Sequence, residues 1–160
     1  MRMEPIRKQG FTLTEMLVTL AILSILAMAV LPLAETVVKR EKEIELRRNL
    51  RLMREAIDMY KKLADAKKID YEEDTMGYPP DLETLVEGVE INKDTDGEER
   101  TQIIKFLRRI PKDPMMNSYD WGLRSYQDDP DPQRWGGENV YDIFTRSTGT
   151  GLDGTKYRDW

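Results

Sequence analysis

The sequence of 160 residues contains no cysteine and no histidine. Without cysteine there is no disulfide framework and no thiol nucleophile, and without histidine the usual general base and the commonest metal ligand are missing. Any metal site must therefore be built from oxygen ligands, which favours calcium or magnesium. Lys and Arg number 25 against 30 Asp and Glu, for a net charge of −5, so the overall charge does not favour a nucleic-acid partner.

Charge is also nearly missing from one long stretch near the N-terminus. Residues 11–34 are mostly apolar, and Glu15 is the one charged residue among them. As a helix, this run is about 36 Å long, which is enough to cross a hydrocarbon core of ~30 Å. A carboxylate inside a membrane-spanning segment costs ~2.5–3.5 kcal/mol on insertion scales. Glu15 is therefore predicted to be a functional residue that needs a partner.

A short basic segment, residues 1–10, precedes the apolar run. Three interpretations fit this order: a secretory signal cleaved near Ala27-Met28-Ala29, an uncleaved anchor, or a leader removed just before the run. The run is longer than the ~7–15 apolar residues of an ordinary signal, which disfavours the first. The basic residues favour a cytoplasmic N-terminus, and the long domain that follows is then translocated.

Beyond Ala34 the apolar pattern becomes amphipathic without a break. Its apolar residues are spaced by three and four, as on one face of a helix: Leu46, Leu50, Met53, Ile57, Tyr60 and Ala64. This stripe is predicted to pack on a domain of the same chain, as part of one helix over residues 12–66. Pro32 is predicted to kink or locally open that helix, because proline removes a backbone hydrogen bond.

The rest of the chain predicts short elements separated by turns. Asp81 is placed to cap a short helix over Leu82–Val86 that ends at Gly88. A second short helix is expected to carry Ile103, Ile104 and Leu107 on one face and to stop at Pro111. The segments Tyr119–Tyr126 and Val140–Thr145 are strand-like, so a small antiparallel sheet folded against the helix stripe is expected.

Three acidic segments are candidates for a site. Asn92–Gly97 is similar to the first half of a calcium loop, but the twelfth position, where a bidentate glutamate belongs, is Ile103; we interpret it as a charged turn. Asp128, Asp129 and Asp131 are interleaved with prolines and are interpreted as a solvated loop rather than a catalytic cluster. In the tail, residues 147–160, carbonyls together with Asp153 and Asp159 could surround a hard cation, or the tail is a frayed end with Trp160 docked on the domain.

The start of the apolar run resembles a known processing site. Gly10-Phe11-Thr12-Leu13-Thr14-Glu15 is similar to the prepilin processing site of type IV pilins and type II secretion pseudopilins, in which a basic leader and a glycine precede a phenylalanine and a glutamate. The resemblance implies cleavage by prepilin peptidase between Gly10 and Phe11 and N-methylation of Phe11. It also implies that Glu15 and the Phe11 amine act in assembly, and Pro32 lies where the family usually has its helix-breaking proline.

The globular part resembles the major pseudopilin of type II secretion. Tyr78-Pro79 followed by Leu82–Val86 is similar to that family's "YP…LEALV", Ile110–Pro114 with Asn117-Ser118-Tyr119 to its "LPKDPWGNPY", and Tyr141–Thr145 to its "YDIFS". The family's C-terminal loop binds calcium, so the resemblance implies calcium held by Asp153, Asp159 and the Leu152 carbonyl. Thr148–Gly151 replaces a step that normally supplies a further aspartate.

The resemblance implies an α+β, pilin-like fold in which one long helix packs against a small antiparallel sheet with short helices and a Gly/Asp-rich C-terminal loop. The expected parts are a leader (1–10), a transmembrane or filament-core half of the helix (11–34), an amphipathic half (35–66) and a periplasmic domain (67–160).

The implied function is that of a structural subunit with no active site, anchored once in the bacterial inner membrane with a cytoplasmic N-terminus and a periplasmic domain. It would polymerise into the pseudopilus that drives export of folded proteins across the outer membrane. Expected partners are copies of itself, minor pseudopilins, an inner-membrane assembly platform, prepilin peptidase and, before assembly, membrane lipid, but no nucleic acid. The alternatives are a type IV pilin of a surface fibre and a membrane-anchored periplasmic module that binds calcium or acts as an enzyme.

Overall fold

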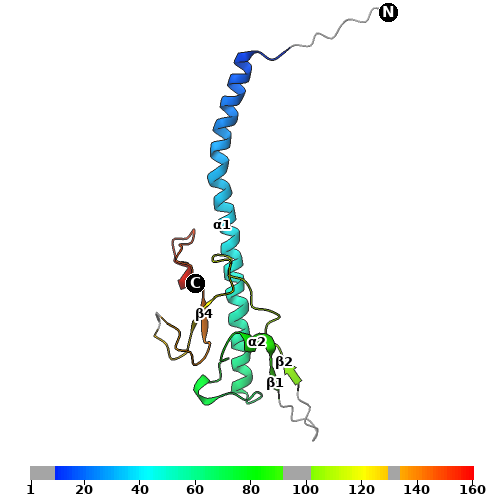
Figure 1. The fold of residues 1–160 in the computed structure, drawn as a ribbon, viewed down its shortest axis with the longest axis vertical. Coiled ribbons are helices and arrows are strands. Elements are labelled where there is room, and N and C mark those ends of the chain that lie inside the picture. Colours follow the sequence, from blue (N-terminus) through cyan, green and yellow to red (C-terminus); the bar gives the residue numbers. More distant parts are fainter. Residues whose placement is uncertain (1–9, 92–101, 130–133) are drawn as a thin grey trace, which may run out of the picture. The chain divides into compact units, whose positions relative to one another are not determined.

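The computed structural model describes residues 10–91, 102–129 and 134–160, with the backbone but not the side chains of residues 29, 31 and 32 (Figure 1). The leader up to Gln9, the turn Asn92–Gly97 and Asp131 lie outside these ranges. The described elements, in order, are α1 (Leu13–Asp65), η1 (Glu73–Thr75), α2 (Glu83–Glu87), β1 (Val89–Ile91), β2 (Gln102–Ile104), β3 (Gly122–Arg124), β4 (Asp142–Phe144) and η2 (Tyr157–Asp159).

The long helix α1 confirms the helix predicted over residues 12–66, with bounds that differ by one residue at each end. The chain divides into two compact units within α1, one ending at Arg40 and the next beginning at Glu41. From Leu13 on, the first unit is helical, and none of its described side chains is buried. The second unit contains the amphipathic part of α1 and all the short elements.

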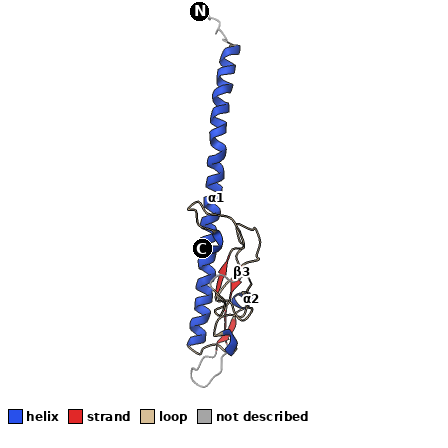
Figure 2. Ribbon diagram, turned by 90° about the vertical axis from the view of Figure 1, so that its left-hand side faces the viewer, coloured by secondary structure: helices blue, strands red, loops and turns tan. Residues whose placement is uncertain are grey.

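The core of the second unit is built on the predicted stripe. All six stripe residues are at most 3% exposed: Leu46, Leu50, Met53, Ile57, Tyr60 and Ala64. Buried residues from the later segments meet them: Leu82, Leu85, Ile91, Leu107, Trp121, Val140, Ile143 and Tyr157. The short strands lie to one side of the C-terminal part of α1 (Figure 2). The three-and-four spacing therefore identified the buried face of the helix correctly, since only one face of it meets the domain.

Among the described residues, the predicted small antiparallel sheet is present as β3 with β4, and a second two-stranded antiparallel sheet, β1 with β2, was not predicted. β1 pairs with β2, with Glu90 opposite Ile103, and β3 pairs with β4, with Leu123 opposite Ile143. Both β3 and β4 fall within the predicted strand-like segments, but each is three residues long. The fold is thus α+β with antiparallel pairing, as expected for a pilin-like chain.

The helix predicted to carry Ile103, Ile104 and Leu107 is wrong. Ile103 and Ile104 belong to strand β2, and the backbone N–H of Leu107 donates to the Leu85 carbonyl at 2.9 Å. Two adjacent β-branched residues suit a strand, and the available partner strand β1 decides the outcome. Spacing over so few residues cannot separate the two structures.

The short helix α2 follows the prediction closely. The Asp81 carboxylate accepts hydrogen bonds from the Thr84 N–H and the Thr84 hydroxyl, both at 2.7 Å, so Asp81 caps the first turn. Gly88 ends the helix with a φ of +88°, and a Cβ there would lie 2.5 Å from the Ile104 carbonyl oxygen. Glycine is needed at this position both for the backbone angle and for the close approach of β2.

Candidate processing and assembly site

The N-terminus of α1 places Glu15 in a capping box. The Glu15 N–H donates to the Thr12 hydroxyl at 3.2 Å, while the Thr12 N–H and hydroxyl each donate to Glu15 Oε2 at 3.4 Å. Thr12 precedes the first helical residue, Leu13, so the pair forms the T-x-x-E arrangement that satisfies free N–H groups at a helix start. The first turn also provides a positive dipole end beside the carboxylate. Glu15 therefore has a partner within its own chain, which the sequence analysis did not predict.

The capping contacts of Glu15 are weak. A donor–acceptor distance of 3.4 Å lies beyond the usual ~2.7–3.2 Å for an N–H donor. By contrast, two other polar side chains of the apolar run bond at ordinary length to backbone carbonyls one turn earlier. The Thr19 hydroxyl donates to Met16 at 2.9 Å and the Ser24 hydroxyl to Leu20 at 2.8 Å. Glu15, the one charged side chain of this run, would therefore gain stability from a stronger partner.

The residues at the predicted cut are open. Phe11 is 78% exposed, and among the described residues no atom lies within 4 Å of where a Cβ on Gly10 would be. Neither crowding nor an unusual backbone angle requires glycine at position 10. Any need for a small residue there comes from a partner such as a peptidase.

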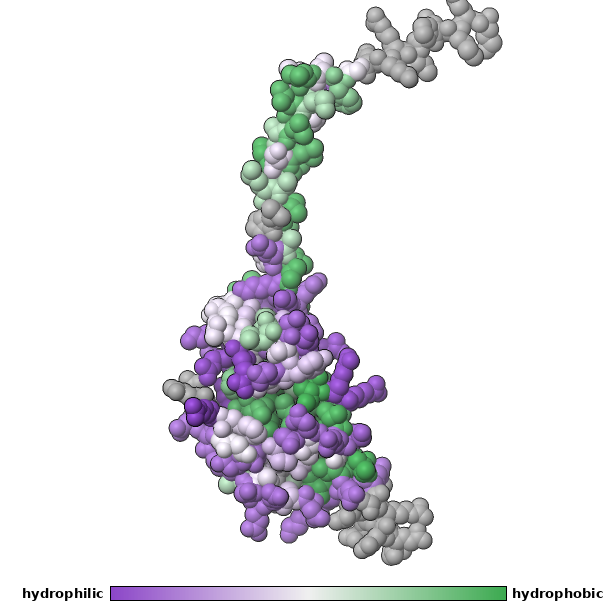
Figure 3. Space-filling model, in the orientation of Figure 1, coloured by the Kyte–Doolittle hydropathy of each residue, from purple (hydrophilic) through white to green (hydrophobic). Residues whose placement is uncertain are grey.

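The large apolar side chains that the structure describes in this run are exposed all the way round. Between Leu13 and Leu33 they are each 53% to 77% exposed, and the described part of this stretch is mostly green (Figure 3). By length and composition α1 is able to cross a membrane, and none of its most apolar window is buried. So much exposed apolar surface requires lipid or other protein around it.

The helix assignment of α1 continues through position 32. The Pro32 side chain lies outside what the structure describes, so the kink there stays a prediction.

The predicted calcium ligands lie in the C-terminal loop. Asp153 precedes a left-handed glycine, Gly154 with φ +84°, and Asp159 ends the short helix η2. The Leu152 N–H donates to the Glu43 carboxylate at 2.8 Å. Within the described ranges, no group of three or more Asp and Glu side chains is placed to hold a metal ion.

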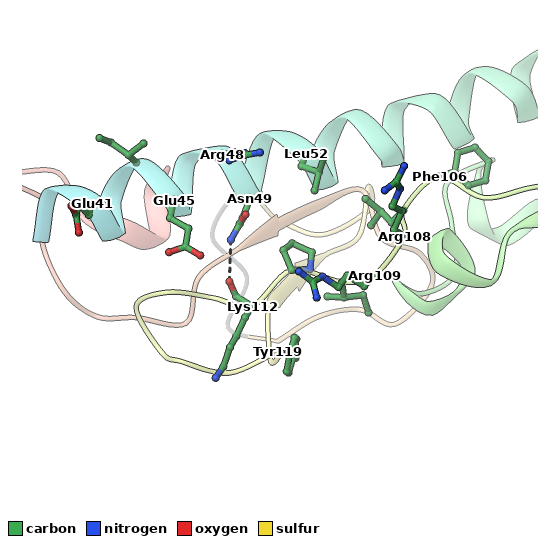
Figure 4. A pocket seen from close by; sticks show the side chains of 14 residues that line it. Glu41, Glu45, Arg48, Asn49, Leu52, Phe106, Arg108, Arg109, Lys112 and Tyr119 are labelled. Carbon is green, nitrogen blue, oxygen red and sulfur yellow. Dashed lines mark hydrogen bonds between the residues drawn. The ribbon is translucent and has the colours of Figure 1, made fainter. Parts of the chain in front are cut away.

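A groove of about 960 Å³ lies on the second unit, between α1 and the segment from Phe106 to Lys112. Figure 4 shows Glu41 and Glu45 projecting from α1 and Arg108 and Arg109 from the facing segment. Asn49 crosses the groove and donates to the Lys112 carbonyl at 3.0 Å. None of the predicted site residues lines it.

Comparison with known families gives one match. Residues 6–31 match the family model described as the prokaryotic N-terminal methylation motif. No curated protein and no solved structure matches the chain. The match covers the second half of the predicted leader, the predicted cut between Gly10 and Phe11, and most of the exposed apolar run.

The motif, the fold and the exposed helix together define a class. The methylation motif supports a type IV pilin-like or pseudopilin protein that prepilin peptidase processes and that polymerises with copies of itself. The apolar helix fits a protein anchored in a membrane by a single pass.

Proposed function

We propose that this chain is the major structural subunit of a type II secretion pseudopilus. The observation that carries the proposal is the exposed apolar half of α1 with a single, weakly held carboxylate near its start. In a bilayer this helix is a stable anchor, and in a bundle of identical helices it becomes the filament core. The second unit, with its charged surface, would form the outside of the filament.

Processing supplies the missing partner for Glu15. Hydrolysis of the Gly10–Phe11 peptide bond frees the amine of Phe11, which is then methylated and stays positively charged. Both this amine and the Glu15 carboxylate are costly in a low-dielectric environment, and pairing them offsets both costs together. When a subunit joins the filament, its Phe11 amine would meet the Glu15 carboxylate of a neighbour.

The globular segments favour the secretion branch. The three segments that resemble the major pseudopilin family form α2 with its Asp81 cap, a turn centred on buried Asp113, and strand β4. The resemblance thus includes core positions such as Leu85 and Ile143, both 0% exposed. The residue types at core positions are set by the packing of one particular domain, so a resemblance there is more specific. The methylation motif, by contrast, is shared by the whole class.

The remaining parts of the proposal follow from the same assignment. The subunit has no active site of its own, its N-terminus is cytoplasmic, and its second unit is periplasmic. Minor pseudopilins, the inner-membrane assembly platform and prepilin peptidase are its protein partners. The groove beside Asn49 has carboxylates and the Arg48 guanidinium on α1 and further guanidinium groups on the facing segment, which is a surface of mixed charge rather than a set of convergent catalytic groups.

A type IV pilin of a surface fibre is the second candidate, because the methylation motif is common to both. Neighbouring genes for a secretion ATPase and a secretin would favour secretion, whereas genes for pilus retraction would favour the fibre. A membrane-anchored periplasmic module would keep its leader, so a mature chain that begins at Met1 would contradict both filament proposals.

The test combines processing with assembly. The chain is co-expressed with prepilin peptidase and the assembly platform, and the mature N-terminus is determined by mass spectrometry. We expect the wild type to begin with methylated Phe11 and to form filaments. Glu15→Ala should be cut but should fail to assemble, whereas Glu35→Ala, a matched carboxylate beyond the apolar run, should assemble normally.

Two outcomes would contradict parts of the proposal. Normal filaments from Glu15→Ala would show that the carboxylate has no role in assembly. Filaments that cannot restore secretion in a strain lacking its major pseudopilin, but that reach the cell surface, would identify a type IV pilin instead.

A further inference from the structure

The C-terminal loop, residues 147–160, contains little regular structure and must be held in place by specific contacts. Within the loop, the Gly151 N–H donates to the Thr155 carbonyl at 2.7 Å and the Tyr157 N–H to the Gly149 carbonyl at 3.1 Å. These bonds close a compact turn but do not attach it to the domain. The family resemblance assigns that attachment to a calcium ion.

Both oxygens of Asp153, the central predicted ligand, are already occupied by protein donors. Oδ2 accepts from the Arg47 guanidinium at 2.8 Å, and Oδ1 accepts the Thr155 N–H at 3.0 Å and its hydroxyl at 2.6 Å. Asp153 thus forms an ion pair with the Arg47 guanidinium, and no oxygen of its carboxylate lacks a donor.

A carboxylate on α1, the helix that carries Arg47, also holds the loop. Glu43 is 8% exposed, and its Oε1 accepts the Leu152 N–H at 2.8 Å and the Tyr157 hydroxyl at 2.9 Å. Glu43 and Arg47 are four residues apart, so they lie on one face of α1. The helix thus presents an acceptor and a cation side by side to a single short stretch of loop.

The aromatic end of the loop completes the attachment. The Arg47 guanidinium lies 4.0 Å from the centre of the Trp160 ring, a cation–π contact, and Trp160 packs edge-on against Tyr157 with ring centres 5.0 Å apart. Two turns further along α1, Arg54 donates to the Trp160 carbonyl oxygen at 2.8 Å. Arg47 therefore contacts both the acidic turn and the aromatic end.

We propose that the Arg47 guanidinium takes the place of a metal ion, so that this chain anchors its C-terminal loop without calcium. A calcium ion needs six to eight oxygen ligands, and a divalent ion bound at Asp153 would meet the positive charge already paired with it. In the family that this chain resembles, the step at Thr148–Gly151 supplies a further aspartate. This chain has no acidic residue there, which agrees with the loss of a metal site. The predicted ligand set of Asp153, Asp159 and the Leu152 carbonyl thus does not fit calcium here.

The test measures the stability of the full chain in detergent, with excess calcium and with excess chelator. Unfolding is followed by tryptophan fluorescence, since all three tryptophans lie in the second unit. We expect the wild-type midpoint to be the same in both conditions within about 1 °C. A lower midpoint in chelator, restored by calcium, would overturn the proposal.

Variants test whether Arg47 and Asp153 act as a pair. Arg47→Ala and Asp153→Asn should each lower the midpoint by about 3–6 °C, and the double variant should lose less than the sum. Arg51→Ala, an arginine one turn along the same helix, is the matched control and should change the midpoint by less than about 1 °C. Strict additivity would show that the pair does not act as the anchor.

These experiments measure folding, which does not depend on processing or assembly. A result that contradicts the role of Arg47 would therefore leave the proposed function untouched. If Arg47→Ala does not fold, Arg47→Lys replaces it. Lysine keeps the charge but loses the fork and the planar contact with Trp160, so an intermediate loss is expected. A wild-type midpoint in Arg47→Lys would overturn the stacking part of the proposal.

Discussion

The buried carboxylate of Asp113 provides the sharpest test of how the second unit is held together. Asp113 is 0% exposed; its Oδ1 accepts the Met115 N–H at 2.8 Å and the Met116 N–H at 3.4 Å, and its Oδ2 accepts the Thr145 hydroxyl at 2.5 Å. One side chain thus fixes the turn after Pro111 and ties it to the end of strand β4. Replacing Asp113 with alanine removes all three bonds.

The expected loss can be estimated from the groups left without an acceptor. Thr145 is 0% exposed, and its hydroxyl would keep only the bond that it accepts from the Ser147 N–H at 3.1 Å. Its buried O–H donor, left without an acceptor, costs ~1–3 kcal/mol. The two backbone N–H groups belong to less buried residues and add about 1–2 kcal/mol between them. Asp113→Ala should therefore lower the free energy of unfolding by about 2–5 kcal/mol, a large part of the ~5–15 kcal/mol of a typical domain.

Chemical denaturation of the full chain in detergent, followed by tryptophan fluorescence, measures this loss. Trp121 is a local probe, because it is 3% exposed and its indole N–H donates to the Pro111 carbonyl at 2.9 Å. Thr145→Val removes two bonds at nearly constant volume, the one to Asp113 and the one accepted from the Ser147 N–H, and should cost less than the loss of three. In a double-mutant cycle, Asp113→Ala and Thr145→Val should be strongly non-additive, since they share the bond between Asp113 and Thr145. A loss below about 1 kcal/mol for Asp113→Ala would refute the reasoning.

Three further predictions concern the same unit. Burial and the hydrogen bond to Glu43 raise the pKa of Tyr157 from 10.0 to about 12. The protonated Tyr157 therefore stabilises the fold fully below pH 10, and this stabilisation is lost as pH rises through 12. Over that window the free energy of unfolding should fall by up to about 3 kcal/mol, and Tyr157→Phe should make the fall smaller. Gly88→Ala should destabilise by more than about 2 kcal/mol, because of its positive φ and the 2.5 Å approach to the Ile104 carbonyl; an unchanged denaturation midpoint would contradict this. Ile143→Ala, at 0% exposure, should cost about 2–5 kcal/mol by the same measurement, and a smaller loss would show that the core around β4 can collapse.

Much of the fold could be predicted where one physical signal dominates. The stripe from Leu46 to Ala64 follows helical spacing over several turns, and Asp81 and Gly88 carry the local chemistry of a helix start and end. The segment around Ile103 could not be predicted, because its structure depends on pairing with β1. Apolar spacing alone does not contain that information.

The candidate site divides in the same way. Gly10, Phe11 and Glu15 lie within six residues of sequence, so their motif is readable without a structure. The T-x-x-E pattern of Thr12 and Glu15 is equally local. The anchors of the C-terminal loop are different, because Glu43 and Tyr157 are 114 residues apart and Arg47 and Asp153 are 106 apart. Nothing local to Arg47 indicates an aspartate partner, and only the folded chain brings the two together.

The capping box at Thr12 and Glu15 has a consequence for how much subunit stays in the membrane. In the proposed filament, a subunit that is added exchanges the weak capping contacts of Glu15 for a contact with a neighbour's amine. The free energy gained at Glu15 is therefore only the difference between the energies of these two contacts. Every ~1.4 kcal/mol of that difference changes the concentration at which filaments form by a factor of ten. Thr12 therefore influences the filament without touching a neighbour: a stronger cap favours a larger reserve of free subunits, and a weaker cap favours longer filaments.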